Sequence, residues 1–317
     1  MAAPGKGNAR KVVLAAMAGN GAIAVSKFVA AWLSGSATML AEGVHSLADT
    51  ANQALLLLGM RLSRSESSEL YPLGRTKESY FWAFIVSLVL FFLGGVYAIH
   101  EGVHKLNHPG EALGSPWVAI VVLVASIGFE SFSFYVAVRE FNRGRGGRGL
   151  RQALFHGKDP TIPLVLLEDA GAVGGLVIAL IAVTTSWLTG SAVVDGVGSI
   201  VIGVLLCVIG VGLAHDTRSL LIGEGATPEA CAEVRRIVES SEGVEAVRQL
   251  LTLHLGPDTV LLALKVRFRP GLSVSELESV IDRLETAVRA EQPEMKRIFV
   301  EADGDYDAAR AAPAATT

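Results

Sequence analysis

Residues 37–59 read ATMLAEGVHSLADTANQALLLLG, and this stretch decides the fold. It is apolar enough to cross the hydrocarbon core of a bilayer as a helix, for which about 20 residues suffice. Yet it contains His45 and Asp49, which lie four residues apart and therefore on one helix face. Ionisable groups at membrane depth are costly, so they usually mark a binding site or an ion path. A nitrogen and an oxygen donor side by side also suit a borderline divalent metal such as zinc.

The composition of the whole chain favours a membrane protein. Of its 317 residues, 51% are hydrophobic and 18% are charged, and the mean hydropathy is +0.46. A soluble domain of this size has about a quarter charged residues. The apolar excess lies before about residue 215, and the remainder has the composition of a soluble domain. The two cysteines, Cys207 and Cys231, provide neither a disulfide framework nor a thiolate metal cluster.

Six segments have the length and apolar character of transmembrane helices. They lie at approximately 12–33, 37–60, 80–102, 116–138, 162–186 and 192–213. The first is too long for the core of a signal peptide, so we expect it to be retained. Arg and Lys are concentrated before it and in two alternate loops, which places these loops and both termini in the cytoplasm by the positive-inside rule. Without a targeting segment, a bacterial-type plasma membrane is expected.

The region after His215 predicts a small α+β domain. Its expected elements are a helix at 228–240, strands at 244–255 and 259–268, a helix at 272–290 and a strand at 297–301. Thr227 and Ser273 are the expected N-caps, and Glu276 completes a capping box with Ser273. The order α-β-β-α-β predicts helices on one face of a sheet. The predicted domains are thus a tail (1–11), a six-helix membrane domain (12–215), an α+β domain (216–304) and a disordered end (305–317).

A second intramembrane carboxylate, Asp169, lies in the fifth predicted span. Two ligands from one helix and one or two from another can close a tetrahedral metal site between packed helices. Because such ligands bind metal only when deprotonated, protons and metal compete for them, and a transporter can use this competition. The alternative is that His45 and Asp49 only form hydrogen bonds between helices.

Further motifs follow one another in a specific order. They are Asn20 and Lys27 before Ser34-Gly-Ser36, Tyr71-Pro-Leu-Gly-Arg-Thr-Lys-Glu78, and Val194-Asp-Gly-Val-Gly-Ser-Ile-Val-Ile-Gly203. Together with the His-x-x-x-Asp motif, Asp169, the six spans and the α-β-β-α-β tail, they resemble the cation diffusion facilitator family over roughly residues 11 to 303. Phe129-Glu130 with Val138-Arg-Glu-Phe-Asn142, and Leu167-Glu-Asp-Ala-Gly-Ala172, are most similar to the branch that includes the human zinc transporter nine type.

The resemblance implies a homodimer that exports a divalent cation and imports protons. It also implies four intramembrane ligands, two each from the second and fifth spans. His45, Asp49 and Asp169 match three of them, but the fourth position holds Val165. Water or Glu168 then has to complete the site, although Glu168 lies about 100° around the helix from Asp169. Otherwise Glu168 is a proton carrier or an interhelix hydrogen-bonding group.

Four other ionisable residues lie in or beside the predicted spans. Glu42, three residues before His45, can share its helix face, and Glu130 is a candidate for proton transfer or for pairing with a basic group. Lys27 either snorkels to the interface or neutralises Asp195.

The resemblance implies secondary metal sites that this chain does not match well. The loop has Tyr71 and Arg75 where histidines often stand, and the tail positions are Arg248, Leu264, Glu301 and Asp303. We expect no metal at either place and a structural role for His254. The basic run at 143–148 is expected to contact anionic lipid head groups rather than nucleic acid.

The sequence therefore favours a membrane exporter of a divalent transition metal, with Zn²⁺ as the first choice. A histidine ligand argues against Mg²⁺ and Ca²⁺ but does not separate zinc from Mn²⁺, Fe²⁺ or Co²⁺. The alternative of another class is a non-transporting membrane metal sensor or scaffold. The chain has no nucleophile–base pair, phosphate loop or nucleotide motif, so we expect neither an enzyme nor a resident cofactor. The expected partners are the metal ion, protons, lipids and a second copy.

Overall fold

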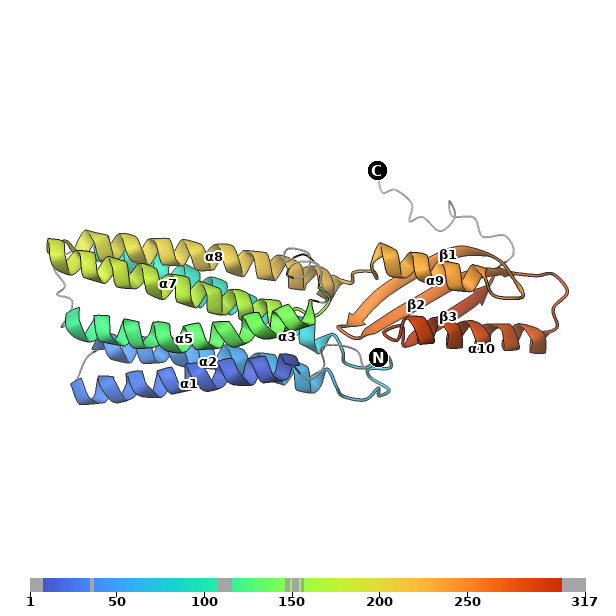
Figure 1. The fold of residues 1–317 in the computed structure, drawn as a ribbon, viewed down its shortest axis with the longest axis horizontal. Coiled ribbons are helices and arrows are strands. Elements are labelled where there is room, and N and C mark those ends of the chain that lie inside the picture. The colour runs from blue at the N-terminus through green and yellow to red at the C-terminus, as the bar shows by residue number, and fades with distance from the viewer. Residues whose placement is uncertain are drawn as a thin grey trace. The chain divides into compact units, whose positions relative to one another are not determined.

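The computed structural model describes residues 8–34, 37–107, 116–145, 149, 154 and 157–303, and the side chains of residues 33–45 are among those outside the description. The chain divides into two compact units, Met1–Ser219 and Leu220–Thr317, here called the first and second unit (Figure 1). The end that the sequence predicts to be disordered, residues 305–317, lies outside the described residues.

Long helices build the first unit. They are α1 (Asn8–Ser34), α2 (Ala37–Leu62), α3 (Glu78–Val89), η1 (Leu90–Val96), α4 (Tyr97–Asn107), α5 (Pro116–Gly144), α7 (Thr161–Thr189) and α8 (Ala192–Ile222). The elements α3, η1 and α4 follow one another without a break, and η1 is π-helical.

Five helical stretches within the described residues are long and apolar enough to cross a membrane. They are Ala9–Val29, Glu78–Asn107, Ala119–Gly144, Thr161–Thr189 and Val193–Ile222, which correspond to the first and the third to sixth predicted spans. The helix α2 occupies the second predicted span, and its side chains are described from Ser46 onward. The mostly helical membrane domain predicted from the sequence is confirmed.

Several helices continue beyond their predicted ends, and α5 and α8 do so by the most residues. The helix α5 ends at Gly144 and α8 at Ile222, whereas the apolar stretches end near residues 138 and 213. In α5 the extra turns contain Arg143, which pairs with Glu140 at 2.6 Å. Charged residues with good helix propensity continue a helix past its apolar segment, so the hydropathy pattern marks the membrane-embedded part and not the helix end.

Apolar side chains both fill the first unit and cover its outside. The inner cluster includes Val12, Leu56 and Val165, whereas Phe132 and Val208 are among the large apolar side chains that are exposed. A soluble protein seldom exposes so much apolar surface, which indicates that lipid covers it.

The helix containing η1 packs directly against α8. A Cβ atom added to Gly95 would lie 2.9 Å from the backbone nitrogen of Cys207, and one added to Gly102 would lie 2.6 Å from the backbone oxygen of Gly196. Small residues allow such a close backbone approach between membrane helices.

The second unit is a three-stranded sheet with two helices. Its elements are α9 (Pro228–Glu239), β1 (Val244–Gly256), β2 (Thr259–Phe268), α10 (Val274–Glu291) and β3 (Arg297–Ala302). The strand order is β1-β2-β3, with β1 antiparallel and β3 parallel to β2. A core that includes Val234, Leu262 and Leu284 joins both helices to the sheet. Thr227 caps α9 and Ser273 forms the capping box with Glu276, so the predicted α+β fold and both predicted caps are confirmed.

Candidate functional site

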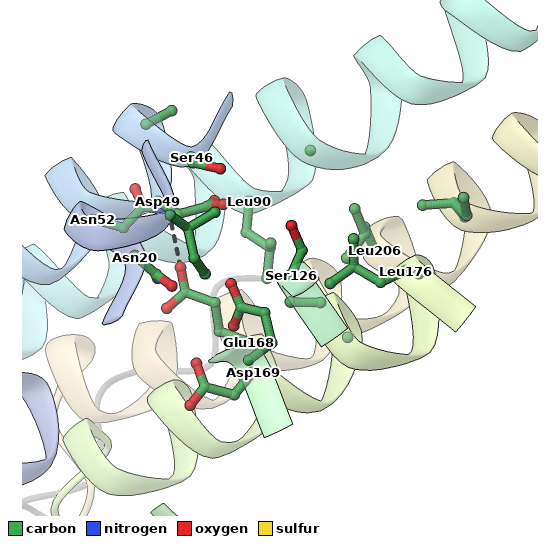
Figure 2. Close-up of a pocket in the computed structure, with 18 of the residues that line it drawn as sticks. Asn20, Ser46, Asp49, Asn52, Leu90, Ser126, Glu168, Asp169, Leu176 and Leu206 are labelled. Carbon is green, nitrogen blue, oxygen red and sulfur yellow. Dashed lines mark hydrogen bonds between the residues drawn. The ribbon is translucent and has the colours of Figure 1, made fainter. Parts of the chain in front are cut away.

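A cavity of about 170 Å³ lies inside the first unit, between residues from α1, α2, α3, η1, α5, α7 and α8 (Figure 2). Its polar lining residues are Asn20, Lys27, Ser46, Asp49, Asn52, Ser126, Glu130, Glu168 and Asp169. Four of these are carboxylic acids and one is a lysine. Oxygen donors gathered around a cavity of this kind suit a cation, because buried carboxylates need a positive partner.

Two predicted metal ligands from different helices reach this cavity. Asp49 lies on α2 and Asp169 on α7, and both line the cavity wall (Figure 2). Asp169 is 1% exposed, and its Oδ2 atom accepts a hydrogen bond from Ser133 Oγ of α5 at 2.7 Å. The side chain of the third predicted ligand, His45, lies outside the described residues, as does that of Glu42.

The acidic groups of the cavity are not gathered around one point in this conformation. Among the His, Cys, Asp and Glu side chains that the structure describes, no three are arranged to hold one metal ion. A site built from Asp49 and Asp169 therefore needs a further donor or a movement of the side chains.

Glu168 connects α7 to α2. Its Oε1 atom accepts a hydrogen bond from Asn52 Nδ2 at 3.1 Å (Figure 2). Its Oε2 atom accepts one from Gln53 Nε2 at 3.0 Å. Its side chain is 5% exposed and also lines the cavity. The interhelix hydrogen bond considered for Glu168 is thus present, and it engages both carboxylate oxygens.

Val165 does not line the cavity. It is fully buried in the apolar cluster that includes Leu56 and Phe141, one helical turn before Asp169. The position at which the family resemblance implies a fourth ligand therefore lies in an apolar environment.

The other two ionisable candidates, Lys27 and Asp195, have different partners in the structure. Lys27 lines the cavity and donates a hydrogen bond to Ser46 Oγ at 2.9 Å. Asp195 forms an ion pair with Lys105 at 2.9 Å. The suggestion that Lys27 neutralises Asp195 is therefore wrong, because Lys105 of α4 lies beside the start of α8.

Sequence reasoning missed three polar groups near the cavity. Gln53 was not singled out, although it follows Asn52 in the same span. Ser126 and Ser133 lie four residues before and three residues after Glu130. This spacing places Ser126, Glu130 and Ser133 on one face of α5. Such a polar stripe in an apolar helix is the sequence signal that identifies the two serines.

Residues at the positions implied for secondary metal sites have other partners. The guanidinium of Arg75 lies 4.9 Å from the centre of the Tyr71 ring and pairs with Glu78. In the second unit, Lys265 Nζ lies 3.0 Å from Glu301 and 3.7 Å from Asp303.

Arg248 and Leu264, at the other positions implied for a metal site in the cytoplasmic domain, lie on the sheet of the second unit. His254 lies on the same sheet. Arg248 is exposed, Leu264 belongs to the core, and His254 is 5% exposed.

Two family descriptions match consecutive parts of this chain. The description of the cation efflux transmembrane domain matches residues 13–222, and that of the cation efflux cytoplasmic domain matches residues 226–304. The chain belongs to the cation efflux family. Residues 13–222 accordingly correspond to the family's transmembrane domain, and residues 226–304, which lie in the second unit, correspond to its cytoplasmic domain.

Similar proteins come from animals, plants and bacteria. The proton-coupled zinc antiporter SLC30A9, mitochondrial, of Xenopus laevis is 31% identical over 292 residues, which cover 90% of this chain and 52% of that protein. The metal tolerance protein C4 of Arabidopsis thaliana is 32% identical over 252 residues, covering 78% and 54%. The zinc transporter ZitB of Yersinia pestis is 26% identical over 186 residues, covering 57% and 53%. The chain thus spans about half the length of these relatives.

Proposed function

We propose that this protein exports a divalent transition metal, Zn²⁺ in the first place, from the cytoplasm in exchange for protons. The observation that carries the proposal is that Asp49 and Asp169, from two different helices, line one cavity in the transmembrane domain of a cation efflux protein. The printed names of the relatives, a proton-coupled zinc antiporter and a zinc transporter, favour zinc.

The chemistry of the donors explains how metal and protons exchange. Asp49 and Asp169 bind metal only as carboxylates, and His45 binds it only as a neutral imidazole, so protons arriving from outside displace the ion. The Ser133 hydroxyl donates a hydrogen bond to Asp169 and so keeps that carboxylate oriented. Oxygen donors alone suit Mn²⁺ as well as Zn²⁺, and the His45 nitrogen shifts the preference toward zinc.

The bonds of Glu168 fix the two ligand-bearing helices to each other. Asn52 and Gln53 lie three and four residues after Asp49, and Glu168 directly precedes Asp169. This clamp holds α2 and α7 in register, so that both aspartates face the same cavity. We therefore assign Glu168 the role of positioning the helices, and we assign metal binding to the adjacent Asp169.

The assembly and the membrane are part of the same proposal. The cytoplasmic domain that matches residues 226–304 supports a homodimer. The bacterial-type plasma membrane expected from the sequence has a mitochondrial membrane as its alternative, given the printed name of the animal relatives.

Transport by the reconstituted full-length protein tests this function. Proteoliposomes containing a zinc-sensitive dye and an imposed pH gradient should take up Zn²⁺, and collapse of the gradient should stop the uptake. Asp49→Ala and Asp169→Ala should abolish it, whereas Asp282→Ala, on the exposed side of α10, should not. Parallel assays with Mn²⁺, Fe²⁺ and Co²⁺ give the metal preference. If the unmodified protein moves none of these ions, the transport proposal fails in favour of a sensor or scaffold.

A further inference from the structure

A stripe of polar side chains on α5 faces the cavity. Ser126, Glu130 and Ser133 follow one another at spacings of four and three residues, which places them on one helix face. Their exposed fractions are 4%, 6% and 5%, so none of them reaches solvent or lipid to any extent. Ser126 and Glu130 line the cavity, and Ser133 donates its hydrogen bond to Asp169. Glu130 therefore lies on the face of α5 that borders the cavity and Asp169.

The Glu130 carboxylate is not satisfied by its surroundings. Its Oε2 atom is buried and has no hydrogen-bond partner among the described residues. The Oδ1 atom of Asn20, which lines the same cavity, is also buried and unpartnered there. An unpartnered buried acceptor is expensive, and far more so when it is a charged oxygen. Two residues of the cavity wall therefore each carry a buried oxygen without a partner in the described part of the chain, and a cation bound between their side chains would satisfy both.

The charges around Glu130 favour a divalent ion. Glu130 is repelled by Asp169 and Asp49 and attracted by Lys27, the only basic residue among the described residues that line the cavity. One lysine does not balance these three acids. A divalent cation between them converts the repulsion into attraction, and this effect is strong where water is largely excluded.

We propose that Glu130 is a metal ligand supplied by a third helix, α5, and that its carboxylate replaces the ligand missing at Val165. The inference rests on the proposed transport function and assigns a further ligand to the same site. Because no three described acids converge in this structure, binding requires rotation of the Glu130 side chain, which has three rotatable bonds. Lys27 provides an opposing charge at the cavity wall.

Metal binding by the purified full-length protein tests the proposal. In titration calorimetry with Zn²⁺, Glu130→Gln should raise the Kd about tenfold or more, because it removes a charged ligand but keeps the side-chain shape. Glu140→Gln is the matched control. Glu140 lies on the same helix and also has a buried, unpartnered Oε2 atom, but it pairs with Arg143 and does not line the cavity. This control should bind Zn²⁺ as the unmodified protein does.

The absorption spectrum of bound Co²⁺ separates a ligand from a positioning residue. The d–d bands should change in Glu130→Gln, and Glu130→His should restore binding with bands shifted by the new nitrogen donor. Should Glu130→Gln not fold, the Glu130→His spectrum decides, and bands identical to those of the unmodified protein overturn the proposal. Unaltered Zn²⁺ affinity and Co²⁺ bands in Glu130→Gln, beside lost binding in Asp169→Ala, overturn it as well. The transport proposal fails separately, through absence of binding and uptake in the unmodified protein.

Discussion

The two units use the same charged and amide residues in opposite ways. In the first unit, polar side chains are buried and linked between helices, as in the bonds from Asn52 and Gln53 to Glu168. In the second unit, charged side chains form short-range surface pairs such as Arg289 with Glu285, over a core of aliphatic residues. Surface pairs contribute little to stability, whereas buried polar groups persist only where they are satisfied or have a function. The difference supports our proposal that the buried acids of the first unit bind the transported ion.

The largest expected effect follows from removing one cavity charge without changing shape. Asp169→Asn should reduce Zn²⁺ uptake on the order of 100-fold, because a neutral amide is a poor metal ligand. The thermal midpoint should change little, since the new amide oxygen still accepts the Ser133 hydrogen bond. Asp282→Asn, an exposed change in the second unit, should leave both quantities unaltered. Uptake assays and thermal melts of the same preparations check this contrast.

A second contrast concerns stability. Glu168→Ala leaves the amides of Asn52 and Gln53 without their acceptor, and we expect it to cost about 1–3 kcal/mol of unfolding free energy. Glu285→Ala removes a surface pair with Arg289 and should cost less than about 0.5 kcal/mol. Denaturation of the detergent-solubilised protein measures both. If both changes cost the same unfolding free energy, the hydrogen bonds of Glu168 do not stabilise the contact between α2 and α7 as proposed.

The Val165→His variant tests whether position 165 belongs to the metal site or to the apolar core. The family pattern alone predicts tighter and more zinc-selective binding, because histidine is a ligand expected there. The structure buries Val165 in the apolar cluster, so we expect a loss of about 2 kcal/mol in stability and no gain in Zn²⁺ affinity. Titration calorimetry beside a thermal melt decides, and tighter Zn²⁺ binding would contradict the observed placement.

The smallest expected effect lies in the second unit. Hydrogen bonds donated by the hydroxyl and backbone N–H of Ser273 lower the pKa of Glu276 below its usual value of about 4.3. A carboxyl with a depressed folded-state pKa stabilises the fold above its unfolded pKa and loses this contribution as the pH falls through the lower value. Hydrogen exchange at the first turn of α10, corrected for the intrinsic rate, should therefore accelerate at acidic pH. In Ser273→Ala the exchange should already be fast near neutral pH, and equal rates in both proteins would exclude the capping effect.

The sequence predicts the elements well because their signals are local. Apolar length marks the membrane helices, and Thr227 and Ser273 mark the starts of α9 and α10. The π-helical segment Leu90–Val96 has no comparable signal, because it differs from an α-helix only in the spacing of its backbone hydrogen bonds. The parallel pairing of β3 with β2 likewise depends on tertiary packing.

The site is only partly predictable because its contacts join distant helices. Asp49 and Asp169 are conspicuous as acids in apolar segments, and both line the cavity. The amide donors of Glu168 are more than 100 residues away in the chain, at separations of 116 and 115. The alternative that Lys27 neutralises Asp195 fails for the same reason, because no local rule favours Lys105 over Lys27 as its partner.

The central claim is that Asp49 of α2 and Asp169 of α7 hold the same transported ion. A double-mutant cycle of Zn²⁺ affinity tests it most directly, with Asp49→Asn, Asp169→Asn, the double variant and the unmodified full-length protein. If both groups bind one ion, each single change removes most of the binding, and the double variant is far less impaired than the sum of the two effects. Single variants that bind Zn²⁺ as tightly as the unmodified protein, or effects that simply add, would contradict a shared site.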